Sequence, residues 1–125
     1  RIIVSVDTLE YLVRGGRIGK ARGLVGGLIQ IKPILHLVDG EIHPYEQVRT
    51  TRKARNRLIS IVTEQKDSIV GAAVATTTEL DLANEIAGTL KTELGLKEIP
   101  ILRIGPVVGT HGGPGAVGVA FVLDA

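Results

Sequence analysis

Two strand-like segments joined by Asp39-Gly40 restrict the fold of this 125-residue chain more than any other feature. The dipeptide Asp-Gly is typical of the tight turn of a β-hairpin, in which both central residues take positive φ. The flanking segments, residues 31–38 and 41–48, each have a length that is common for strands in globular proteins. The sequence therefore predicts an antiparallel β-hairpin over residues 31–48.

Apolar runs and helical repeats predict the other elements. Strands are expected over residues 2–6, 69–76, 99–104 and 116–123, and helices around residues 9–13 and over residues 20–28, 52–65 and 79–94. The predicted helix 20–28 contains Gly23, Gly26 and Gly27, which are poor helix formers. Glycines at these positions indicate that another group approaches the backbone closely.

Residues with short polar side chains precede the predicted helices and are suited to cap them. The first helix would be capped by Asp7 or Thr8, the third by Thr50 or Thr51, and the fourth by Thr77 or Thr78. Glycines follow two of the helices, because Gly15-Gly16 comes after the first and Gly95 after the last. These residues set the expected helix ends.

The order β-α-α-β-β-α-β-α-β-β predicts an α/β fold, specifically an α+β two-layer sandwich with one mixed β-sheet and helices mainly on one face. A chain of 125 residues fits one domain with one core. The chain contains one Phe, two Tyr and no Trp or Met. Its core must therefore consist mainly of Val, Ile, Leu and Ala.

Several classes of protein are disfavoured by composition. The chain has no cysteine, so disulfides and thiolate chemistry are excluded, and a reducing cytoplasm is the expected location. No apolar run reaches the roughly 20 residues that span a bilayer, so no stable membrane insertion is expected. The chain begins at Arg1 and runs at once into a strand-like segment, which suggests an excised domain.

Positive charge is concentrated in one half of the chain. Residues 14–57 hold ten Lys or Arg and three acidic residues, for a net charge of +7, whereas residues 58–125 have a net charge of −4. Such a segment attracts phosphate, nucleic acid or an acidic protein. One hypothesis is therefore a phosphate- or nucleic-acid-binding regulatory module that uses the basic half from Arg14 to Arg57. Few aromatic residues are present to stack on bases, and no nucleic-acid-binding motif is visible.

Residues 14–19, with the sequence Arg-Gly-Gly-Arg-Ile-Gly, lie between two predicted helices. Backbone N–H groups, the start of a helix and two guanidinium groups would meet there, an environment that favours anions. The alternative is a glycine turn with surface arginines. The segment matches neither the dinucleotide-binding nor the P-loop pattern.

The segment 109–118, with the sequence GTHGGPGAVG, places His111 among glycines and one proline. Glycine permits close backbone approach and Pro114 restrains the loop, so His111 could donate to a carboxylate or phosphoryl oxygen. A structural turn with an incidental histidine is the alternative. No metal site is expected, because the histidines lack ligand spacing. A hydrolase with His111 as base lacks a nearby serine or cysteine nucleophile.

Four blocks of sequence together resemble the DegV family of bacterial fatty-acid-binding proteins. They are Leu9-Glu-Tyr-Leu-Val-Arg-Gly-Gly-Arg-Ile-Gly19, then Ile31-Lys-Pro-Ile34 with Asp39-Gly40, then Val48-Arg-Thr50, and finally Ile104-Gly-Pro-Val-Val-Gly-Thr-His111 with Gly113-Pro-Gly-Ala116. The resemblance is to the C-terminal domain of the family over residues 1–125. The family's N-terminal Rossmann-like domain would be absent from this chain.

The resemblance implies a lipid-binding carrier protein rather than an enzyme. Such a protein holds one long-chain fatty acid without a further cofactor and presents its carboxylate to a fatty acid kinase, which phosphorylates it for phospholipid synthesis. The partners expected are thus a fatty acid and a kinase subunit, with no nucleic acid. The phosphotransferase activity would belong to the kinase.

The resemblance also implies roles for particular residues. His111, with the neighbouring Gly109 and Thr110, would contact the head group, and Arg17 and Arg49 match basic positions associated with docking of the kinase. Aliphatic residues on the glycine-bearing predicted helix are candidates for lining a channel for the tail, although core packing is the alternative for them. These residues are Leu24, Val25, Leu28 and Ile29.

Overall fold

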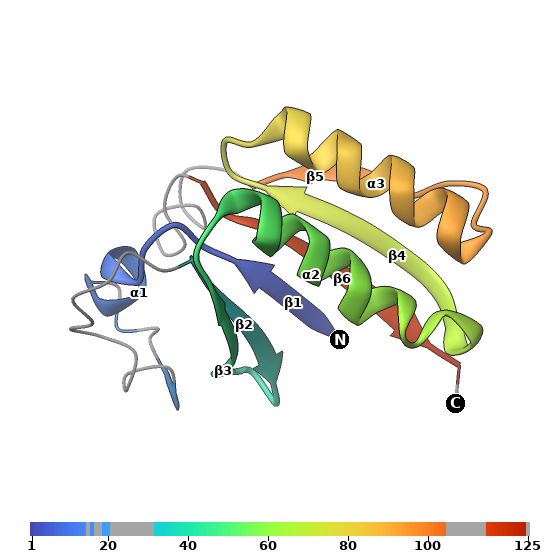
Figure 1. The fold of residues 1–125 in the computed structure, drawn as a ribbon. Helices are drawn as coiled ribbons and strands as arrows, with labels where there is room; N and C mark the ends of the chain where they lie inside the picture. Colours follow the sequence, from blue (N-terminus) through green and yellow to red (C-terminus); the bar gives the residue numbers. More distant parts are fainter. Residues whose placement is uncertain (15, 17–18, 21–31, 105–114, 125) are drawn as a thin grey trace.

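A computed structural model describes residues 1–14, 16, 19–20, 32–104 and 115–124 (Figure 1). Its strands are β1 (Ile2–Ser5), β2 (Lys32–Val38), β3 (Glu41–Val48), β4 (Ile69–Thr76), β5 (Ile101–Arg103) and β6 (Val117–Leu123). Its helices are α1 (Glu10–Arg14), α2 (Thr51–Thr63), α3 (Leu80–Leu94) and the 3-10 turn η2 (Lys66–Ser68).

The strands form one six-stranded sheet in the order β3-β2-β1-β6-β4-β5. Neighbouring strands are antiparallel except for β4 and β5, which are parallel, so the sheet is mixed as expected. The predicted hairpin is confirmed over β2 and β3, and its turn residues Asp39 and Gly40 have φ of 51° and 76°. These angles match the type of turn that the Asp-Gly dipeptide favours.

The two long helices, α2 and α3, lie side by side over one face of the sheet (Figure 1). Both helices turn apolar stripes toward the strands, and the main core forms between these layers from side chains such as Leu58, Ile86 and Val119, each fully buried. Thr50 caps α2, because its hydroxyl accepts a hydrogen bond of 3.0 Å from the backbone N–H of Lys53. The two-layer α/β fold predicted from the sequence is confirmed.

The short helix α1 packs against the opposite face of the sheet. Its residues Leu9 and Leu12 are buried in a second, smaller cluster with Leu35 and with Val6, which follows β1. Thr8 accepts a hydrogen bond from the backbone N–H of Glu10 at 3.2 Å, as expected for a residue before the helix. α1 therefore covers part of the face that α2 and α3 leave uncovered.

Some predicted boundaries differ from the structure. β5 is limited to Ile101–Arg103, shorter than the predicted 99–104, because it pairs with β4 alone over three residues at the sheet edge. The prediction that Thr77 or Thr78 caps α3 is wrong, because Glu79 occupies the N-cap position. The predicted C-terminal stop is correct, since Gly95 has a φ of 66° there. The helix predicted over residues 20–28 lies outside the described residues, apart from Lys20.

Candidate functional site

Each of the six strands begins or ends at one particular end of the sheet, and segments that carry candidate residues are connected there. The register pairs Ser5 with Ile34 and Val117, Thr76 with Val117 and Arg103, and Lys32 with Val48. We call this the site end of the sheet. Residues 105–114 connect β5 to β6 and therefore join the described structure at the site end on both sides. Residues 21–31 reach the site end where Lys32 begins β2, whereas Lys20 lies near Glu41 at the hairpin turn.

An ion pair and a glycine lie against one another at the site end. Lys32 Nζ, at the start of β2, lies 2.7 Å from Asp7 Oδ1, just after β1. Gly115, which precedes β6, lies directly against the same carboxylate, because a Cβ atom at this position would overlap Asp7 Oδ2. Gly115 also has a φ of 84°, a conformation that favours glycine. The sequence at position 115 is therefore restricted by both space and backbone conformation.

Three consecutive threonines at the end of β4 hold residues 115 and 116. The Thr76 hydroxyl donates to the carbonyl of Ala116 at 2.9 Å, and the Thr77 hydroxyl accepts from the Ala116 N–H at 3.2 Å. The Thr78 hydroxyl accepts from the Gly115 N–H at 2.8 Å. Thr77 and Thr78, which were predicted as helix caps, thus bind the two residues that precede β6. Thr76 instead accepts a hydrogen bond of 2.9 Å from the backbone N–H of Glu79, the N-cap residue of α3.

The face of the sheet opposite α2 and α3 is apolar. Because successive side chains of a strand point to opposite faces, the register assigns one alternating set of residues to this face. Among the described strand residues of this set none carries a charge, and the only polar one is Gln47. We call the set the open face: Ile2, Val4, Pro33, Leu35, Leu37, Ile42, Pro44, Gln47, Gly71, Ala73, Ala75, Leu102, Gly118, Ala120 and Val122.

Much of the open face is in contact with solvent. The exposed fractions are 42% for Ile2, 41% for Leu37, 55% for Leu102 and 61% for Val122. The middle strands β4 and β6 contribute mainly glycine and alanine to it, so their own side chains extend only a short distance from the sheet. Large exposed apolar surfaces mark sites of binding to a ligand or partner. The sequence contains a signal for this face, because small residues alternate with larger ones along β6, but the candidate site residues were predicted from other segments.

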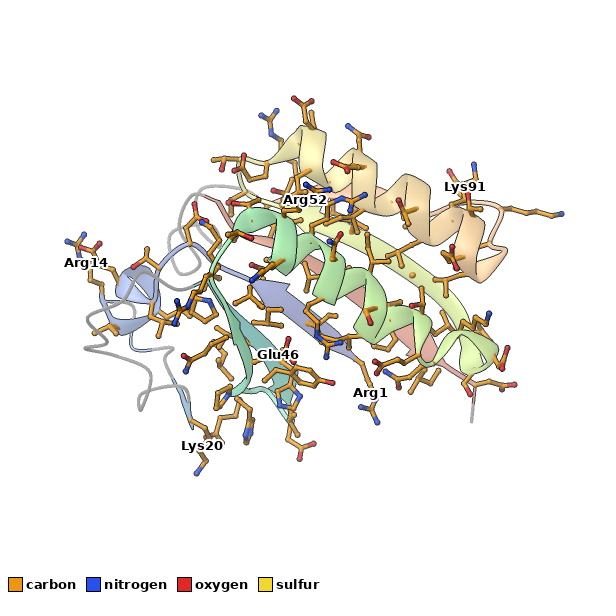
Figure 2. All side chains as sticks on the ribbon, viewed as in Figure 1. Arg1, Arg14, Lys20, Glu46, Arg52 and Lys91 are labelled. Carbon is orange, nitrogen blue, oxygen red and sulfur yellow. The ribbon has the colours of Figure 1, made fainter. Side chains whose placement is uncertain are left out.

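Most described basic residues of the segment 14–57 have an acidic partner. The pairs are Arg14–Glu10, Lys20–Glu41, Lys32–Asp7, Arg55–Glu85 and Arg57–Glu46. Figure 2 shows Arg14 and Lys20 on the α1 side of the molecule and Arg52 beside α2. Within the described ranges, the exposed side chains of Arg49, Arg52 and Lys53 form no ion pair. Among the described residues of this segment, the cations without an acidic partner therefore form a small group around the start of α2.

A cluster of polar rings lies on the hairpin, on the side of the sheet that faces α2. The ring centroid of His36 lies 5.7 Å from that of His43 and 5.3 Å from that of Tyr45. Burial lowers the pKa of His36 from its ordinary value, and the nearby charges of His43 and Arg1 lower it further. Among the described residues no group of three or more His, Cys, Asp or Glu could hold a metal ion.

Of the predicted site residues, only Arg49 is described by the structure. It is exposed and lies between β3 and the cap of α2, at the site end. The head-group candidates Gly109, Thr110 and His111, the docking candidate Arg17 and the tail candidates Leu24, Val25, Leu28 and Ile29 lie outside the described residues. In the part of the chain that the structure describes, no helix is long and apolar enough to span a bilayer.

Comparison with known proteins gives a consistent family match. The family model described as "Uncharacterised protein, DegV family" matches residues 1–124. A DegV domain-containing protein of Halalkalibacterium halodurans is 39% identical over 95% of this chain and 43% of its own length. The protein DegV of Bacillus subtilis is 35% identical over 97% of this chain and 44% of its own length. The chain thus spans less than half the length of these relatives.

Solved structures share the fold. A fatty-acid-binding DegV family protein from Streptococcus agalactiae has a TM-score of 0.83 and 34% identity, covering 99% of this chain and 44% of that one. A DegV family protein from Thermus thermophilus, described by its fatty acid binding, has a TM-score of 0.85 and 30% identity over 95% of this chain and 44% of that one. The similarity extends over nearly the whole chain.

Proposed function

Because the chain belongs to the DegV family, we propose that it binds a long-chain fatty acid as part of a longer protein. The observation that carries this proposal is the open face, where exposed apolar side chains surround strands that present mainly glycine and alanine. Burial of one methylene group contributes about 0.8 kcal/mol, so a long acyl tail on such a surface supplies most of the binding free energy. The related proteins from Streptococcus agalactiae and Thermus thermophilus are described as binding fatty acids, which supports a fatty acid as the ligand.

In this proposal the chain corresponds to the C-terminal domain of the family, and the remaining part of the longer protein covers the ligand. This proposal is supported by the length of the match, because the chain covers only 43–44% of the length of its relatives. Leu24, Val25, Leu28 and Ile29 extend the apolar surface for the tail. The acyl tail is the proposed occupant of the open face.

The carboxylate of the fatty acid lies toward the site end, where Gly109, Thr110 and His111 contact it. The site end is favoured because residues 105–114 join the sheet there. A histidine is suited to this role, because its ring nitrogens donate hydrogen bonds and its charge adjusts near neutral pH. Because the apolar tail supplies most of the binding free energy, the histidine contributes to the orientation of the ligand more than to its affinity.

A fatty acid kinase is the proposed partner, and the chain itself acts as carrier. The kinase transfers the terminal phosphoryl group of ATP to a carboxylate oxygen, which yields an acyl phosphate and ADP in the cytoplasm for use in phospholipid synthesis. Arg17 and Arg49 dock an acidic surface of the kinase. Arg52 and Lys53, which follow Arg49 closely in sequence and form no ion pair with a described residue, support this proposal. A group of positive charges attracts an acidic partner and orients its approach.

Nucleic acid is disfavoured as the alternative ligand. Arg55 and Arg57 of the basic half contact Glu85 and Glu46 at 2.6 and 2.7 Å, so fewer cations are available for phosphate contacts. Strong electrostatic binding to nucleic acid needs several such contacts and depends steeply on salt. The structure thus favours a small, local docking surface over an extended phosphate-binding one.

Mass spectrometry of the full-length protein, purified gently from bacteria, tests the ligand. We expect a co-purified long-chain fatty acid, and we expect the bound acid to exchange with added oleate. A protein that carries no fatty acid and takes up neither palmitate nor oleate in excess contradicts the proposal. The role of His111 is tested separately by His111→Ala, which should retain most lipid but impair formation of acyl phosphate by the kinase.

A further inference from the structure

Three neighbouring hydroxyl groups converge on one short piece of backbone at the site end. Thr76 donates to the Ala116 carbonyl, Thr77 accepts from the Ala116 N–H, and Thr78 accepts from the Gly115 N–H. A backbone bond of 3.1 Å from the Thr77 N–H also reaches the Ala116 carbonyl. Residues 115 and 116 are therefore held by the turn between β4 and α3, although almost 40 residues separate them in sequence.

The same turn also holds the residue at the other side of the intervening segment. The N–H of Ile104 donates to the carbonyl of Thr76 at 2.8 Å. Ile104 and Gly115, which flank residues 105–114 in sequence, are thus both bound to residues 76–78. Formation of regular strand pairing requires neither the Thr77 nor the Thr78 hydroxyl, so these two contacts are additional to the sheet.

The anchor at Gly115 is supported from a second direction. Asp7 lies directly against Gly115, and its carboxylate is held by Lys32 at 2.7 Å. Gly115 is therefore adjacent both to the Thr78 hydroxyl and to the carboxylate of the Asp7–Lys32 ion pair. Two independent contacts on one residue restrict its position more than either contact would alone.

We propose that the threonine turn, Thr76–Thr78, is a positioning element that fixes both ends of the segment carrying the head-group residues of the fatty acid site. This inference rests on the proposed function, in which His111 contacts the carboxylate. In general, fixing both ends of a segment restricts the conformations open to it, and the sequence places His111 between Ile104 and Gly115. Accurate placement matters because small displacements of a polar group weaken its contact with a ligand strongly.

The test measures the imidazole of His111 in the full-length protein by NMR, before and after addition of oleate. The variant Thr78→Val removes the hydroxyl that accepts from Gly115 but keeps a similar shape, and Thr78→Ser restores a hydroxyl. Thr78 is exposed, so its replacement leaves the core intact. Thr92→Val is the matched control, because Thr92 is an exposed threonine whose hydroxyl bonds only within α3. The resonance of His111 is identified by its loss in His111→Gln.

We expect the wild type, Thr78→Ser and Thr92→Val to show the same oleate-dependent shift of the His111 resonance. In Thr78→Val this shift should fall by at least about twofold, while the melting temperature and the resonances of His36 and His43 stay unchanged. A merely structural role for Thr78 would instead lower the melting temperature without a selective effect on His111. Thr77→Val, which removes the acceptor for the Ala116 N–H, provides the same test if Thr78→Val does not fold.

The outcomes separate this inference from the proposed function. An equal shift of His111 in the wild type and in both Thr78→Val and Thr77→Val overturns the positioning role alone, because the head-group contact is then present without the turn. A wild-type His111 that does not respond while oleate binds overturns the head-group contact and the positioning role together. Absence of any oleate binding overturns the proposed function itself.

Discussion

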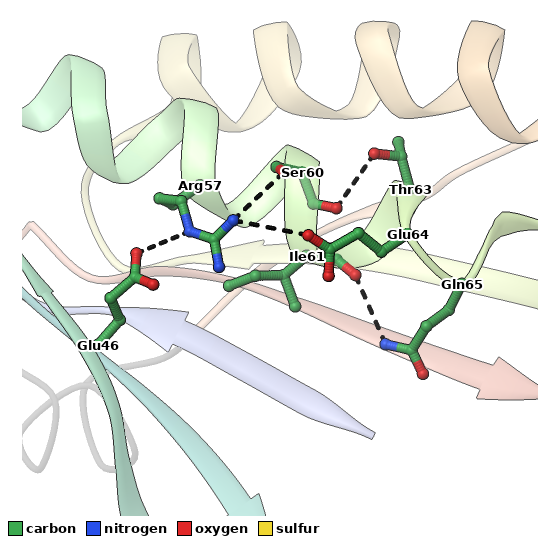
Figure 3. Close-up of polar contacts among 7 residues, drawn as sticks. All are labelled: Glu46, Arg57, Ser60, Ile61, Thr63, Glu64 and Gln65. Atoms are coloured by element: carbon green, nitrogen blue, oxygen red, sulfur yellow. Dashed lines mark hydrogen bonds and ion pairs between the residues drawn. The ribbon is translucent and has the colours of Figure 1, made fainter.

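Arg57 of α2 and Glu46 of the edge strand β3 form an ion pair in which Nε donates to Oε2 at 2.7 Å (Figure 3). Both side chains are about one-third exposed, and the same guanidinium also lies 3.7 Å from Glu64 and 3.3 Å from the Ser60 hydroxyl. The hydrogen bond to Glu46 is the largest cause of a raised pKa of Arg57. This pair attaches the helix layer to the outermost strand of the hairpin.

The change Glu46→Gln should lower the free energy of unfolding by about 0.5–1 kcal/mol, because it removes the charge that faces Arg57 at short range. Urea unfolding at low and high salt measures this loss, which should shrink in high salt. Glu64→Gln is the control, since its contact is longer and its side chain is 61% exposed. Equal losses for the two variants would contradict the importance of the Glu46 contact.

The change Gly115→Ala should destabilise the protein by at least about 1 kcal/mol, since the residue has positive φ and a Cβ atom would overlap the Asp7 carboxylate. Gly88→Ala is the matched control, because Gly88 lies on the exposed side of α3 with open space around it. That variant should stabilise the protein by up to about 1 kcal/mol. Thermal unfolding of both variants measures the contrast, and a neutral Gly115→Ala would show that this backbone position adapts.

Acid should destabilise the protein in part through His36. Folding lowers the pKa of His36 below its value of 6.5 in the unfolded chain, so the unfolded state binds more protons as the pH falls below 6.5. Stability is therefore complete above that pH and declines as the pH drops from 6.5 toward the folded-state pKa. The variant His36→Gln should lose less stability than the wild type between neutral and mildly acidic pH. Urea unfolding at several pH values measures the difference, and parallel pH curves would contradict the assignment.

Charges introduced on the open face should weaken fatty-acid binding. In the full-length protein, Val122→Lys or Leu102→Lys places an ammonium group where the acyl tail is proposed to lie, and we expect the Kd for oleate to rise about tenfold or more. Leu80→Lys is the control, because Leu80 is 42% exposed but lies at the start of α3 on the other side of the sheet. All three sites are exposed, so folding should be little affected. Equal oleate affinity in all three variants would exclude the open face as the tail surface.

Local sequence determined the elements that depend on neighbouring residues. Asp39-Gly40 specified the hairpin because both residues adopt positive φ at low cost, and Thr50 and Gly95 marked the start of α2 and the end of α3. These signals act over a few residues and could be identified without the fold. The family resemblance, which rests on short blocks of sequence, likewise agreed with the match over residues 1–124.

Contacts between distant segments were decided by the tertiary structure alone. Thr77 and Thr78 have the composition of helix caps, yet their hydroxyls bind Ala116 and Gly115, because the strand order places β6 beside β4. The pairing of Arg57 with Glu46 depends in the same way on α2 lying beside the hairpin. A hydrogen-bonding side chain takes whichever partner the fold brings within reach, and only the packing of sheet and helices determines that partner.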